Sequence, residues 1–185
     1  MLAIHRLALC LLLPAALALA QAAPPVATGK DAGLPRAGVQ PKLPRPAVDQ
    51  RVQALGETLL RAIASDEPAL AEDTFFPRPA FLRVKAMQNP GRYWDRLHAR
   101  FARDIHALHA GTPNIAQARF ERLELATRGG LVQPGEEGNR LAYWASRHSR
   151  LHYRIGEQAR SFELRVIISW EDGWYLIHLS EFRSR

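Results

Sequence analysis

Apolar and polar residues alternate along the C-terminal half of the chain, and this two-residue period predicts long β-strands. Between residues 141 and 155 the apolar residues at odd positions are Leu141, Tyr143, Ala145, Leu151, Tyr153 and Ile155. One alternation kept over so many residues indicates a single long, bent strand. Leu123 and Leu125 favour an earlier, shorter strand. The glycine-rich residues 129–138 between the two predict a loop.

A hairpin is predicted at the end of the chain. Even positions are apolar from Phe162 to Trp170, and Asp172-Gly173 then supplies a tight turn. A two-residue turn at Asp172-Gly173 aligns specific pairs across the hairpin and places them on one face, against the helices. The expected pairs are Trp170 with Tyr175, Ile168 with Ile177, and Val166 with Leu179.

Two stretches of the N-terminal half instead have the period of an amphipathic helix. The first covers residues 48–65, and the second begins at Asn89-Pro90 and ends at Gly111. Asn89 is a capping residue before a proline suited to the first helical position. Between them we expect a helical turn at residues 69–73 and a packed loop at residues 75–84. The apolar stripes comprise Val48, Val52, Leu55, Leu59 and Ile63, and then Trp94, Leu97, Phe101, Ile105 and Leu108.

The first 47 residues differ from the rest. Residues 1–22 have a basic start, a short apolar core and small residues at the end, which is typical of a secretory signal peptide cleaved after Ala20 or Ala22. Residues 23–47 are rich in proline and alanine and predict a disordered tether. Residues 48–185 then form a single α+β domain. The protein is therefore expected to be exported, to the periplasm or outside the cell.

Composition narrows the chemistry. The only cysteine is Cys10, inside the signal peptide, so the processed chain has no disulfide and no cysteine-ligated metal. The formal net charge is +7 and comes almost entirely from arginine, which suits carboxylate and phosphate partners. Acidic proteins and anionic envelope polymers fit an exported basic domain. We expect no nucleic acid partner, because no recognition motif is present. The sequence contains no phosphate-binding glycine loop, so we expect no cofactor. No second apolar run is long enough for a transmembrane helix.

Helices followed by long strands and a closing aromatic hairpin resemble the nuclear-transport-factor-2-like superfamily. The motif that carries the resemblance is Trp170-Glu171-Asp172-Gly173-Trp174-Tyr175-Leu176-Ile177-His178-Leu179. The resemblance covers residues 48–185 and implies helices packed in a curved antiparallel sheet, which forms a cone with an internal pocket. The superfamily includes isomerases, dehydratases, cyclases, ligand binders and inert partners. The resemblance therefore implies a fold and leaves the activity open.

The candidate catalytic residues are His98 and Asp95, three residues apart at the edge of the second apolar stripe. A carboxylate beside an imidazole can orient it as a general base at a pocket mouth. The alternative is a surface ion pair on an amphipathic helix. His106 and His109 have metal-ligand spacing, but no third ligand supports a metal site, and stabilisation of the helix end explains them better.

Two candidate binding surfaces follow from the strand alternation. The interior set can stack on a ligand or simply fill the core, and it comprises Tyr143, Tyr153, Trp170 and Tyr175. The outer set is basic and comprises Arg150, His152, Arg154, Arg165 and His178. Ile167, Trp174, Leu176 and Phe182 are expected to share the outer face, which would suit a homodimer interface, an acidic partner or plain solvent exposure.

These patterns favour an exported, non-catalytic domain that binds a small ligand or an acidic partner. One alternative is a small cofactor-free hydrolase or isomerase that uses His98 and Asp95 in the cone interior. Another is a binder of anionic envelope polymers, whose affinity would fall with salt.

Overall fold

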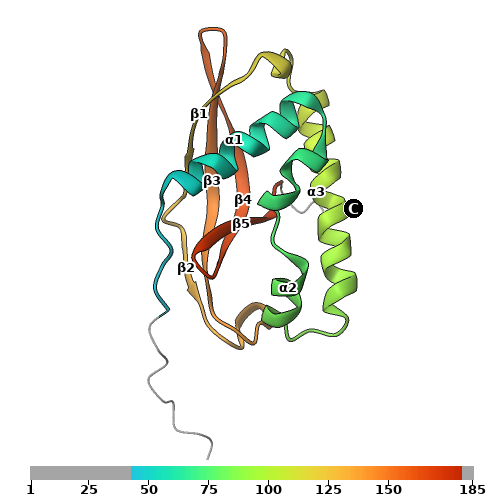
Figure 1. Cartoon of the computed structure of the whole chain (residues 1–185), viewed down its shortest axis with the longest axis vertical. Helices are drawn as coiled ribbons and strands as arrows, with labels where there is room; N and C mark the ends of the chain where they lie inside the picture. The colour runs from blue at the N-terminus through green and yellow to red at the C-terminus, as the bar shows by residue number, and fades with distance from the viewer. Residues whose placement is uncertain (1–42, 181–185) are drawn as a thin grey trace, which may run out of the picture. The chain divides into compact units, whose positions relative to one another are not determined.

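The structure is a computed structural model that describes residues 43–180, in which helices come first and an antiparallel sheet follows (Figure 1). The prediction of an α+β domain is confirmed. The predicted signal peptide at residues 1–22 and most of the predicted tether lie outside the described residues. No helix among residues 43–180 is long and apolar enough to cross a bilayer.

The two amphipathic helices form as predicted. Helix α1 spans Gln50–Ser65, and the Asp49 side chain caps it by accepting from the Arg51 backbone N–H. Helix α3 spans Pro90–Gly111, although its N-cap Asn89 makes no side-chain capping bond. The helical turn predicted at residues 69–73 is the 3₁₀ helix η1, Pro68–Thr74.

The prediction of a loop at residues 75–84 is wrong for most of that segment, because helix α2 spans Arg78–Val84. Pro79 lies in its first turn, where a missing N–H costs no hydrogen bond, so the proline does not break the helix. Phe75 and Phe76 precede α2 as core residues, at 3% and 0% exposure. The Phe76 N–H donates to the Leu176 carbonyl across a short parallel bridge.

Within residues 43–180 the sheet has five strands, with the central order β1-β3-β4-β5 (Figure 1). Strand β2 pairs with the same edge of β3 as β1 does, nearer the start of β3. The strands are β1 Arg119–Glu124, β2 Gly129–Val132, β3 Tyr143–Ile155, β4 Gln158–Trp170 and β5 Gly173–His178. The long alternating strand is thus confirmed as β3.

Strand β2 corrects the prediction of a loop at Gly129-Gly130. Both glycines have positive φ, at 130° and 117°. A Cβ atom on Gly129 would lie 2.2 Å from the Ala145 carbonyl oxygen. Glycine at this position therefore permits the close approach to β3 that forms β2, rather than marking a loop.

The hairpin β4–β5 forms, but the predicted register is wrong. Trp170 is opposite Gly173 and Ile168 is opposite Tyr175, so the pairing is shifted by two residues. Glu171 has a φ of 53°, and the two-residue turn is Glu171-Asp172. A shift of two keeps each side chain on its expected face. A bulge after Val166 then changes the alternation and places His178 opposite Val166.

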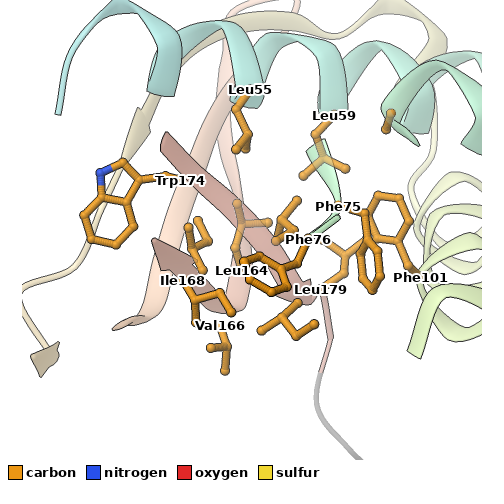
Figure 2. Packing of buried hydrophobic residues seen from close by; sticks show 14 of the residues in the cluster. Leu55, Leu59, Phe75, Phe76, Phe101, Leu164, Val166, Ile168, Trp174 and Leu179 are labelled. Atoms are coloured by element: carbon orange, nitrogen blue, oxygen red, sulfur yellow. The ribbon is translucent and has the colours of Figure 1, made fainter. Parts of the chain in front are cut away.

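Near its C-terminal end the sheet is buried on both faces. Residues 166–169 of β4 are all buried, as are Trp174 and Leu176 of β5. The expectation that Ile167, Trp174 and Leu176 form part of an exposed outer surface is therefore wrong, because their exposures are 0%, 5% and 0%. Phe182, expected on the same surface, lies outside the described residues. Figure 2 shows Leu55 and Leu59 of α1 pointing into the cluster, with Phe75 and Phe101 side by side near α3.

Helix α1 is joined closely to β1. The Gln53 side chain donates to the Leu123 carbonyl at 3.0 Å and accepts from the Leu123 N–H at 2.9 Å. One turn on, a Cβ atom on Gly56 would lie 2.8 Å from both the Leu123 Cβ and the Phe120 ring. The absence of a side chain at Gly56 therefore sets how near α1 lies to β1.

Candidate functional site

His98 and Asp95 do not form a catalytic pair, because each has another partner. The His98 Nε2 atom lies 2.8 Å from Glu72 Oε2, and its ring stacks on Trp94 at 4.7 Å. The Asp95 carboxylate accepts from Arg78 Nε at 3.1 Å. The Glu72 carboxylate can orient the His98 imidazole, while Asp95 makes a surface ion pair with a different element.

The other two histidines of α3 tie its last turns to α1. His106 Nδ1 lies 2.6 Å from Asp66 Oδ1, and His109 Nδ1 lies 2.8 Å from the Ile63 carbonyl oxygen. Among residues 43–180, no group of three or more His, Cys, Asp or Glu is arranged to hold a metal.

The four interior aromatic residues all belong to the hydrophobic cluster or pack against it. Tyr143 is 3% exposed and donates to Glu137 Oε2 at 2.8 Å. Tyr153 is 2% exposed and stacks on Phe162 at 4.7 Å. Burial raises the pKa of both tyrosines, so their hydroxyls stay protonated.

Trp170 and Tyr175 complete the interior set. Their rings meet Phe76 edge-on at 6.2 and 6.0 Å. Both are partly exposed, so they lie at the margin of the cluster, while Tyr143 and Tyr153 lie inside it.

Carboxylates are interleaved with the cations of the outer sheet face. His152 lies 3.3 Å from Glu124, and Arg154 lies 3.5 Å from Glu121. Arg165 contacts the His148 ring at 3.4 Å, and His148 bonds Glu163 at 2.6 Å. The hydrogen bond from His148 is the main cause that lowers the pKa of Glu163. Arg150 is exposed. Local acids therefore offset much of the positive charge predicted for this face.

His178 lies apart from the rest of the outer set, and its predicted placement on the outer face is corrected. The β-bulge puts it opposite the buried residue Val166. Burial lowers the pKa of His178, and the positive charges of Arg100, Lys85 and Arg147 lower it further. Its imidazole is therefore held neutral near the helical side of the sheet.

A different set of cations stands out on α3. Arg92, Arg96 and Arg103 are exposed, and none of them has a carboxylate partner among the described residues. We call these three residues the α3 arginine face. They lie four and seven positions apart, which places them on one side of the helix over about 16 Å.

A groove of about 240 Å³ accompanies the α3 arginine face. The Arg96 guanidinium lies 5.3 Å from the centre of the Tyr93 ring, and Tyr93 packs on the buried Phe81 at 6.0 Å. The core thus fixes the ring on which Arg96 stacks. The groove is lined by Tyr93, Arg96, Leu97, Ala99, Arg100 and Arg103.

The α3 arginine face can bind carboxylate or phosphate groups through planar guanidinium forks. This face was not predicted from the sequence. The signal was present in the sequence. No acidic residue lies three or four positions from Arg96 or Arg103, so neither has an acidic partner within the helix.

None of the protein-family models matches the chain, and neither does any curated protein or solved structure.

Proposed function

We propose that this chain is an exported, non-catalytic domain that binds an acidic protein through the α3 arginine face. The observation that carries this proposal is the set of three exposed arginines without carboxylate partners, beside a groove with an aromatic wall. Exposed cations that lack an internal partner remain available to an incoming anion. On the outer sheet face, by contrast, a competing acid lies beside most of the cations.

Two features favour binding over catalysis. The candidate base His98 and the candidate acid Asp95 have separate partners, Glu72 and Arg78. The interior tyrosines Tyr143 and Tyr153 are almost fully buried, so their rings serve the core rather than an open pocket.

Export and family membership are parts of the same proposal. The basic and apolar pattern of residues 1–22 supports export, to the periplasm or outside the cell. The order of helices followed by an antiparallel sheet with a closing aromatic hairpin supports a nuclear-transport-factor-2-like domain.

The experiment compares two double variants that lose the same charge. R96Q/R103Q alters the α3 arginine face, and R122Q/R154Q alters arginines of the outer sheet that already have acidic partners. Each is titrated calorimetrically with poly-L-glutamate at about 0.1 M salt. Two exposed ion pairs contribute roughly 0.4–2 kcal/mol, so R96Q/R103Q should bind about 2- to 30-fold more weakly.

The control R122Q/R154Q should bind as the unaltered protein does. Equal weakening in both variants would mean that only net charge matters, and the proposal would then be wrong. Binding to a sulfated polysaccharide but not to poly-L-glutamate would replace the acidic protein with an anionic polymer as the partner.

A further inference from the structure

Two tryptophans stand on either side of a small residue across the last three strands of the sheet. Ser169 of β4 is opposite Trp174 of β5, and its hydroxyl oxygen accepts from the Trp144 backbone N–H of β3 at 2.9 Å. Neighbouring strands lie about 4.8 Å apart, so the two indoles flank a serine floor roughly two strand spacings wide. We call Trp144, Ser169 and Trp174 the tryptophan trough.

Residues 43–47 occupy this trough. The Trp144 indole N–H donates to the Leu43 carbonyl at 3.0 Å, and the Trp174 indole N–H donates to the Ala47 carbonyl at 3.2 Å. Arg45 lies midway between Leu43 and Ala47 in the sequence, and its guanidinium lies 5.9 Å from the Trp144 ring and 5.6 Å from the Trp174 ring. Cation–π attraction to both rings therefore selects arginine at this position.

The contacts that hold residues 43–47 in the trough can also be made by a peptide from another chain. Both hydrogen bonds are made to main-chain carbonyls, which every peptide carries. Pro44 and Pro46 flank Arg45 and favour an extended backbone, as in peptides that bind aromatic grooves in the polyproline II conformation. The side chain that the contacts specify is the arginine.

The resident segment is held weakly. No backbone-to-backbone hydrogen bond joins residues 43–47 to the rest of the described chain. Pro44, Arg45 and Ala47 are exposed. Two indole bonds and one stacked cation must offset the entropy lost when five residues are ordered, so the segment is expected to leave the trough part of the time.

Space next to the trough can favour a competing peptide. A groove of about 410 Å³ begins at Ala47 and Trp174 and continues along α1 past Leu55 and Tyr175. The resident segment cannot extend into it, because the chain turns at Asp49 to begin α1. Three carboxylates, Asp49, Asp73 and Asp172, line this groove together with the cations Arg51 and Arg61, and Arg51 pairs with both Asp49 and Asp172. The groove therefore adds space for a longer peptide without a strong charge preference of its own.

We propose that the tryptophan trough is a peptide-binding site for an extended Pro-Arg-Pro segment of a partner protein, and that residues 43–47 are its built-in competitor. The partner segment places its arginine between the two indoles and its following residues in the adjoining groove. This site is separate from the α3 arginine face and has the opposite charge preference.

The test uses a synthetic peptide, acetyl-Leu-Pro-Arg-Pro-Ala-Val amide, which copies residues 43–48. It is titrated into the full chain while the indole N–H signals of Trp144 and Trp174 are followed by NMR. In the Arg45→Ala variant, whose resident segment has lost its cation, the peptide should bind about fivefold or more tightly than in the unaltered protein. A peptide with alanine in place of arginine should bind at least fivefold more weakly to the same variant.

Arg83→Ala is the matched control, because the Arg83 guanidinium stacks at 5.3 Å on a different tryptophan, Trp170. This variant should bind the peptide as the unaltered protein does. R96Q/R103Q should also leave peptide binding unchanged, which separates this proposal from the proposed function. Absence of saturable shifts in the Arg45→Ala variant, or equal binding of the arginine-free peptide, would show that the trough is only an internal anchor.

Discussion

Replacing Gly56 with alanine should destabilise the protein, although alanine is the better helix former. Gly56 lies in the interior of α1, where the exchange alone would stabilise the helix by about 1 kcal/mol. The added Cβ atom, however, would lie 2.8 Å from the Leu123 Cβ and 2.8 Å from the Phe120 ring. Ordinary carbon–carbon contacts are about 3.5–4.0 Å, so the neighbours must move.

The Phe120 ring can rotate, but the Leu123 Cβ position is fixed by the backbone of β1. Relief therefore requires α1 to move away from β1, which lengthens the two Gln53 bonds to Leu123 from 3.0 and 2.9 Å. Overpacking of this kind costs about 1–3 kcal/mol, and weakening two hydrogen bonds adds about 1–2 kcal/mol. After the gain in helix propensity of about 1 kcal/mol is subtracted, the net loss should be about 1–4 kcal/mol.

Urea denaturation followed by circular dichroism at 222 nm measures this loss. Gly111→Ala is the control, because Gly111 is likewise a helical glycine, at the end of α3, and a Cβ atom there would meet nothing within 4 Å. The control should be unchanged or more stable by up to about 1 kcal/mol. A Gly56→Ala variant as stable as the unaltered protein would refute the close α1–β1 junction.

Three further predictions concern the interior. Gln53→Ala should cost about 1–3 kcal/mol in urea denaturation, because it removes both side-chain bonds to the Leu123 backbone, whereas the exposed Gln50→Ala should cost far less. Tyr143→Phe removes the hydroxyl that donates to Glu137 and should cost about 0.5–1.5 kcal/mol; an unchanged unfolding midpoint would contradict this role. The lowered pKa of His178 means that its contribution is fully present above pH 6.5 and is lost as the pH falls, because the unfolded chain takes up the proton first. Between pH 7.5 and 5.5 the unaltered protein should therefore lose more stability than His178→Gln, and equal losses would show that His178 is not responsible.

Hydrophobic periodicity correctly predicted the helices and strands that local residue spacing alone determines. The stripe of α1 and the alternation of β3 follow from local spacing, so both helices and the long strand were placed correctly. Helix α2 was not predicted, because Phe75, Phe76 and the surrounding prolines locally favour a loop. The hairpin register depended on Glu171 adopting a positive φ, which sequence preference for Asp172-Gly173 does not predict.

The candidate site was harder to predict, because the charged partners of its residues come from elements distant in sequence. His98 and Asp95 are close in sequence, yet Glu72 and Arg78 reach them from other elements and separate their roles. The β-bulge that moves His178 leaves no recognisable signal in the alternation of β5. The carboxylates beside Arg154 and His152 belong to β1. The sequence pattern predicted a strand there but did not predict that it pairs with β3.

The lateral margins of the sheet constrain how copies of this protein can associate. At one margin the Leu123 backbone is engaged by the Gln53 amide, and at the other the Leu176 carbonyl is engaged by the Phe76 N–H. At these points a second chain finds no free main-chain groups to extend the ladder. A neighbouring copy that approaches at either of these two points must therefore associate through side chains.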